Sequence, residues 1–200
     1  MSSMPARVTE ERLVLEAAAE CFADRGFEET TIEDVADRAA VSRATVYRYV
    51  GNKQALVARV MIEEAANLIE VVGAALKGAD TVDGLVRTGV ASALRVINDR
   101  PLMARMAGPD LETNLPRFTT DSTGLVRLCV DGLWAVLEPM QGHLLPATGP
   151  VMGRIALEEV VRFVLCRVHT PTLDADNRDP EAAAERASLM LTPAILATFR

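Results

Sequence analysis

The chain is poor in the residues that mark sheets, disulfides and metal sites. Aromatic residues make up only 4% of its 200 residues, and strand-like alternation of apolar and polar residues is hard to find. Three cysteines, Cys21, Cys129 and Cys166, lie far apart without a CxxC pair, so we expect reduced thiols. The two histidines, His143 and His169, show no metal-ligand spacing. We therefore expect no metal and no cofactor.

Long uncharged runs and catalytic signatures are also missing. The longest stretches without charge, 139–153 and 187–199, contain proline and are shorter than the roughly 18 residues of a membrane span. The first residues hold no apolar core of a secretory signal. Neither a GxSxG frame nor a glycine-rich phosphate loop is present. These absences predict a cytoplasmic protein that is not an enzyme and has no membrane partner.

What the chain does contain is ample apolar material and an uneven charge distribution. Half of the residues are hydrophobic, and the net charge is -7. The segment 38–62 nevertheless carries five basic residues and no acid, just after an acid-rich stretch. A local basic patch suits contact with phosphates, but it is equally typical of a solvated helix face. Charge alone does not decide between these two interpretations.

Apolar residues recur at helical spacing from end to end. A first helix is expected over 10–25, where Thr9 can cap the start and Gly26 the end. A second begins after Thr30 or Thr31, since either threonine is followed three residues later by an acid. Ser42 can cap a short third helix, which Gly51 ends.

Longer helices are expected beyond that point, over 53–77, 82–98, 102–107, 120–140, 151–169 and 180–199. Loops rich in proline or glycine are expected over 108–118 and 141–149, and Pro193 is expected to kink or break the last helix. This order predicts an all-α fold. We expect a helix-turn-helix DNA-binding domain over 1–52 and a ligand-binding and dimerisation domain over 53–200.

The stretch 30–56, TTIEDVADRAAVSRATVYRYVGNKQAL, has the pattern of a helix-turn-helix. In this device the second short helix enters the major groove and reads base edges. The residues predicted to contact bases are Arg43, Ala44, Thr45 and Arg48. Those predicted to contact phosphates are Thr31, Ser42, Tyr47, Tyr49, Asn52 and Lys53.

At these residues the chain resembles the TetR family of bacterial regulators. The resemblance covers 7–56 and rests on Phe22, Gly26-Phe27, TTIEDVA, the VS–TVY–Y pattern and NKQAL. The sequence departs from the usual family pattern at two positions: Ala40 stands where the turn often has glycine, and Val50 where phenylalanine is common. An alanine at that turn carries a small energetic cost if its φ is positive. The resemblance implies a homodimer that binds a palindromic operator, usually as a repressor released by a small ligand.

The middle of the chain holds candidates for a ligand pocket. These are Met103, Met106, Phe118, Arg127, Leu133, Trp134, Leu137 and Met140. Their spacing by itself favours ordinary core, whereas the family resemblance implies a ligand cavity among these helices. The mostly apolar set predicts a hydrophobic or amphipathic effector, with Arg127 either meeting an acidic group or lying at the surface.

The helix 151–169 is apolar on more than one side, which predicts a partner. With the last helix it would form a four-helix interface between two copies. The candidates are Ile155, Val161, Val164, Leu165, Val168, Leu191 and Ile195. The alternative function is a helical small-molecule-binding protein or enzyme that has lost DNA binding. The basic, acid-free segment 38–62 argues against that alternative.

Overall fold

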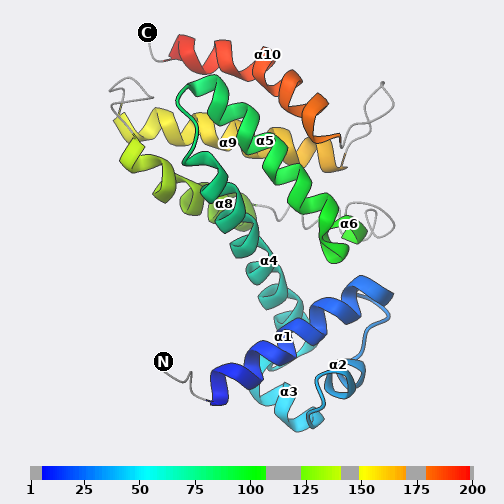
Figure 1. Ribbon diagram of the computed structural model, residues 1–200. Helices are drawn as coiled ribbons and strands as arrows, with labels where there is room; N and C mark the ends of the chain where they lie inside the picture. The colour runs from blue at the N-terminus through cyan, green and yellow to red at the C-terminus, as the bar shows by residue number, and fades with distance from the viewer. Residues whose placement is uncertain (1–5, 107–122, 141–148, 170–178, 199–200) are drawn as a thin grey trace. The chain divides into compact units, whose positions relative to one another are not determined.

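A computed structural model describes residues 6–106, 123–140, 149–169 and 179–198 (Figure 1). Every regular element in these ranges is a helix, which confirms the all-α prediction. The chain forms two compact units, and we describe each by itself. Within the described ranges, no helix has both the length and the apolar character required to cross a membrane.

Unit 1 comprises the described residues up to Glu64 together with a short later helix. Its elements are α1 (Ala6–Arg25), α2 (Ile32–Arg38), α3 (Arg43–Val50), the first half of α4 (Lys53–Leu76) and α6 (Pro101–Met106). Its core is built from fully buried side chains, namely Val14, Phe22, Val35, Val46, Leu56 and Val60. The α6 helix packs against α1, and its Leu102 and Met106 are buried.

The ends of the short helices follow from their capping residues. Thr31 caps α2: the amide of Asp34 donates to its hydroxyl, and its own amide donates to the Asp34 carboxylate. Thr30, the other candidate, is instead buried, with its hydroxyl within hydrogen-bond distance of the Cys21 and Gly26 carbonyls. Hence the expectation of a cap at the start of this helix is confirmed for Thr31.

Unit 2 comprises the described residues from Ala65 onward, without α6. It contains the second half of α4, α5 (Val82–Asp99), α8 (Thr123–Leu137), the 3-10 turn η1 (Glu138–Met140), α9 (Gly149–His169) and α10 (Pro180–Thr198). Helices α5 and α10 lie side by side, as do α8 and α9 (Figure 1). Pro193 stands inside α10 at an exposed position without breaking the helix, so the expected break is absent.

A polar network joins α5 to α10. The Asp83 carboxylate accepts hydrogen bonds from Ser188, from Thr192 at 3.2 Å and from Arg87 at 2.6 Å. Arg87 also forms an ion pair with Glu185. The hydrogen bond from Ser188, followed by that from Arg87, holds the pKa of Asp83 below its ordinary value. These contacts fix one side of α10 to α5.

The sequence predicted most helix boundaries within a few residues, but not the grouping of the helices. The first helix begins at Ala6 instead of residue 10. The expected division into 1–52 and 53–200 differs from the observed units in two places. The first half of α4 and all of α6 belong to unit 1, because their apolar residues complete its core.

Candidate functional site

Helices α2 and α3 are held by a tight turn. The amide of Ala39 donates to the Val35 carbonyl at 2.9 Å, and the amide of Val41 donates to the Ala36 carbonyl at 3.0 Å. Between them Ala40 has a φ of 54°, the left-handed conformation that favours glycine. This confirms the strain expected at that position. The turn leaves α3 with one face buried in unit 1 and the other in solvent.

The solvent face of α3 contains most of the residues predicted to read bases. Arg43, Ala44 and Arg48 are exposed, as is Tyr47. Thr45 is half-buried, and its amide and hydroxyl lie 3.1 Å and 2.9 Å from the Ser42 hydroxyl. The small Ala44 leaves room between the two arginines for close approach of a duplex. The exposed face therefore offers two guanidinium groups and a phenol from one rigid helix.

Acidic groups of the same unit contact this basic face. Arg43 Nη1 lies 3.3 Å from a Glu33 carboxylate oxygen, and Arg48 Nη2 lies 3.5 Å from Glu10. The Tyr49 hydroxyl donates to the same Glu10 oxygen at 2.7 Å. Exposed pairs of this kind contribute roughly 0–1 kcal/mol, so a DNA phosphate can displace them.

The remaining predicted phosphate contacts sit at helix starts. Ser42 caps α3, and the Asn52 side-chain oxygen accepts a hydrogen bond from the Ala55 amide at 2.8 Å. Lys53 Nζ donates to the Glu28 carbonyl at 2.7 Å. Thr31 is an exposed cap, and hydrogen bonds from its hydroxyl and amide lower the pKa of Asp34. Contact of these residues with DNA stays a prediction.

Sequence reasoning did not single out Glu10 or Glu33 as members of this surface. Glu10 lies 38 residues before Arg48 in the chain, and only the packing of α1 against the rest of unit 1 brings the two together. Glu33 is ten residues from Arg43, across the turn. The acid-rich stretch upstream of the basic segment was the available signal for both residues.

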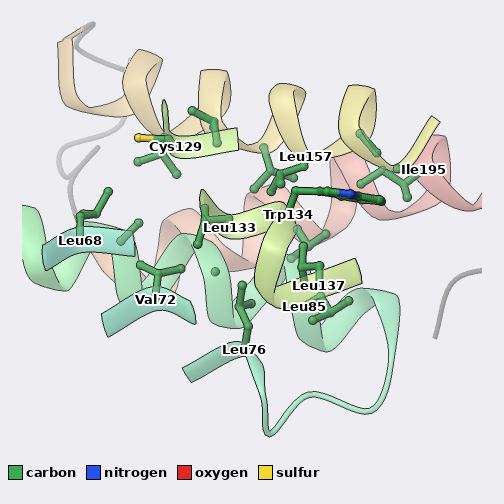
Figure 2. Close-up of a pocket in the computed structure, with 18 of the residues that line it drawn as sticks. Leu68, Val72, Leu76, Leu85, Cys129, Leu133, Trp134, Leu137, Leu157 and Ile195 are labelled. Atoms are coloured by element: carbon green, nitrogen blue, oxygen red, sulfur yellow. The ribbon is translucent and has the colours of Figure 1, made fainter. Parts of the chain in front are cut away.

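Unit 2 contains an apolar cavity of about 130 Å³ that is partly open to solvent (Figure 2). Three residues predicted for the pocket, Leu133, Trp134 and Leu137, line it from α8. The other described lining residues come from α4, α5, α9 and α10, and they are Leu68, Val72, Leu76, Val82, Leu85, Val86, Gly89, Ala93, Ile97, Cys129, Gly153, Ala156, Leu157, Val160, Val161, Val164, Leu165 and Ile195. Sequence spacing did not identify the α4 and α5 contributions.

The other pocket candidates lie elsewhere. Met103 and Met106 belong to α6 in unit 1, where Met106 is buried core. Met140 stands half-buried in η1, and Arg127 lines a separate groove with residues of α8 and α9. Phe118 lies outside the described residues. None of these four described candidates is among the residues that line the apolar cavity.

The candidates for a dimer interface fall into two groups. Val161, Val164, Leu165 and Ile195 line the cavity, and Val168 is buried. Ile155 is exposed and Leu191 is half-buried. Other large apolar side chains of these two helices are also exposed, namely Val151, Leu189, Met190 and Leu196. The role of the predicted residues in an interface between copies stays a prediction.

Within the described ranges, no three His, Cys, Asp or Glu side chains gather in a way that could hold a metal ion. His143 lies outside these ranges. Cys21 and Cys129 are buried, and burial raises the pKa of both thiols, that of Cys129 to about 11. Both thiols therefore stay protonated at neutral pH.

A helix-turn-helix unit followed by an all-helical unit defines the class of helix-turn-helix transcriptional regulators. Residues 14–60, about a quarter of the chain, match the model of the bacterial regulatory proteins of the TetR family. The proteins that this model describes are bacterial regulators.

One curated relative resembles part of the sequence, and two solved structures share the fold. An uncharacterised HTH-type regulator of Mycobacterium tuberculosis, Rv2250c, is 36% identical over 93 residues, which are 46% of this chain and 48% of the relative. The match thus spans about half of that curated relative's length. The repressor AlkX of Dietzia has the same fold with a TM-score of 0.71 at 21% identity, covering 94% of this chain and 95% of its own. FadR of Bacillus subtilis also has this fold, with a TM-score of 0.62 at 17% sequence identity. The match covers 90% of this chain and 96% of FadR.

Proposed function

We propose that this protein is a sequence-specific transcriptional regulator, and most simply a repressor, that binds a palindromic operator as a homodimer. The main support for this proposal is the exposed face of α3. Arg43, Ala44 and Arg48 are exposed there, on a helix that is capped at both ends and packed against a buried core. A helix presented in this way fits the major groove, and an arginine can donate two hydrogen bonds to guanine. Because its proposed partner is chromosomal DNA, we place its action in the cytoplasm.

A second copy is proposed because of the apolar surface of α9 and α10. Leu189 is 68% exposed, Met190 62% and Val151 67%. A monomer gains nothing from exposing side chains of this size, whereas a two-fold interface would bury them. Two copies also supply the two recognition helices that a palindrome requires.

Release by a small molecule is the third part of the proposal. The cavity of unit 2 is lined in part by α4 residues such as Leu68 and Val72, and the same helix begins at Lys53 beside the recognition helix in sequence. A bound effector that favours one arrangement of α4 would alter DNA affinity, typically by about 1–3 kcal/mol of coupling. FadR, a protein of the same fold, binds stearoyl-CoA, which supports a hydrophobic or amphipathic effector.

Two substitutions test the DNA-binding assignment. Arg43→Ala should relax the preference at one base position and cost about 1–3 kcal/mol of binding free energy. Lys53→Ala should weaken all sequences alike and reduce the salt slope by about 1. Fluorescence anisotropy with labelled duplexes at several salt concentrations measures both effects. Equal losses on every sequence for Arg43→Ala would remove this residue from base recognition.

A further inference from the structure

The apolar cavity of unit 2 offers a ligand almost nothing but hydrocarbon. All of its described lining residues are aliphatic, glycine, cysteine or tryptophan, and none carries a charge. The only side-chain heteroatoms in this lining are Sγ of Cys129 and Nε1 of Trp134 (Figure 2). Neither group is an acceptor or donor of the strength that holds an ion or a sugar.

Such a cavity does not hold ordered water well. A buried water usually makes two to four hydrogen bonds, and the side chains of this lining provide one indole donor and one weak thiol. In another protein, an apolar cavity of about 150 Å³ stays dry and binds benzene. The cavity here has a similar volume, about 130 Å³, and is partly open to solvent, so a small ligand has a path into it. The rise in the Cys129 pKa, caused by burial, is consistent with a dry surrounding.

The position of the indole ring depends on a glycine. A Cβ atom built on Gly153 of α9 would lie 2.4 Å from Cη2 and 2.6 Å from Cζ3 of Trp134. No side chain fits at that distance, so glycine at 153 lets the ring lie against α9 beside Leu157 (Figure 2). The indole therefore forms a fixed wall of the cavity and reports on its contents.

We propose that this cavity binds one small uncharged hydrocarbon, about the size of a single substituted ring, and excludes any molecule that would place a charge inside it. The role of this cavity as an effector site rests on the proposed function. The inference limits the effector, which was described above as hydrophobic or amphipathic, to uncharged molecules. The binding itself is a property of unit 2 and is measured without DNA.

Exclusion of charge follows from the uncharged lining, because three arginines of α8 and α9 line a different groove. Arg127, Arg154 and Arg162 line a separate groove, and the last two already form ion pairs with Asp131 and Glu158. No described residue of the apolar cavity can therefore neutralise a carboxylate. Burying an unpaired charge is far more costly than burying a neutral group of the same size.

The test compares toluene with benzoate, which share a ring and differ in charge. Toluene should change the fluorescence of Trp134, the single tryptophan of the chain, and raise the melting temperature with its concentration. Benzoate should bind more weakly by at least about 100-fold. Equal affinity for the two compounds, or no response to toluene up to its solubility, would overturn the inference.

Two matched variants test whether toluene binds in this cavity. Ala156→Leu adds three carbons to the lining, and Ala135→Leu makes the same change on the exposed side of α8. Toluene affinity should fall about tenfold or more in the first variant and stay unchanged in the second. Gly153→Ala, which displaces the indole, should also weaken binding. Unchanged affinity in Ala156→Leu, with a normal circular dichroism spectrum, would contradict the assignment.

The role as effector site is tested separately on an operator complex. Toluene, but not benzoate, should weaken operator binding by the wild-type protein and leave the Ala156→Leu complex intact. If the protein binds an operator that toluene does not release, the effector role fails while the DNA-binding function stands. If no operator is found, the fluorescence titration still decides what the cavity binds.

Discussion

At the scale of single residues, the basic face of α3 is already occupied by the protein's own carboxylates. Glu10 contacts both Arg48 and the Tyr49 hydroxyl, and Glu33 contacts Arg43. Binding to DNA must exchange these contacts for phosphates and bases. Under the proposed function, we expect the acids to lower the affinity for any duplex, and additional base contacts at a specific site to offset this loss.

Glu10→Gln tests this competition. Glutamine keeps an oxygen that accepts the Tyr49 hydrogen bond but removes the charge that holds Arg48. Affinity for random duplex should rise by about two- to fivefold, with a smaller gain for a specific site. Glu29→Gln is the control, because Glu29 is exposed in the same unit and makes no ion pair among the described residues. An equal rise in both variants would mean that net charge alone acts.

Local residue chemistry was also what the sequence predicted best. Thr31, Ser42 and Asn52 cap helices as expected, and Ala40 takes the positive φ expected of a turn position. Capping and turn preferences act over three or four residues, so they can be identified from the sequence alone. The contact of Glu10 with Arg48 crosses 38 residues and depends on packing.

At the scale of elements, the polar network between α5 and α10 is centred on one carboxylate, that of Asp83. Asp83 accepts from Ser188, Thr192 and Arg87, and its pKa lies below the ordinary value of 3.8. A group with a lowered pKa in the folded state contributes stability above its unfolded pKa. That contribution is lost as the pH falls through the folded value.

Asp83→Asn should therefore lower the denaturant midpoint at pH 7, and the difference from wild type should shrink as the pH falls below 3.8 through the lowered pKa. Urea unfolding followed by circular dichroism at a series of pH values measures this difference. Asp80→Asn is a control on the exposed side, since Asp80 lies just before α5 and makes no described contact with α10. A difference of constant size at every pH would show that the Asp83 charge does not stabilise the polar network.

The apolar face of α9 shows where element-level prediction reached its limit. Val161, Val164 and Leu165 made the helix apolar on more than one side, which predicted a partner chain. In the structure these residues line the apolar cavity, and Val161 and Leu165 stay half-buried, so their place in an interface stays a prediction. A hydrophobic pattern identifies which faces are buried but not what covers them, because core, cavity and interface all favour the same side chains.

At the scale of the whole molecule, the exposed apolar side chains of α10 predict self-association. The mass in solution at micromolar concentration should be twice the chain mass of 21.6 kDa. Leu189→Glu places a charge at a side chain that is 68% exposed in the single chain and should give monomers. Leu13→Glu, at an exposed leucine of α1, should leave the dimer intact. Light scattering that gives a monomer for the wild type would contradict the proposed assembly.

The central claim is that two copies of this chain read a palindrome through α3. The most direct measurement selects bound duplexes from a random pool with the purified protein at moderate salt and sequences them. We predict an inverted repeat with half-site centres about 34–36 Å apart, bound by an even number of chains, and a loss of preference at one position in each half-site for Arg43→Ala. Recovery of no sequence above the random background would contradict the claim.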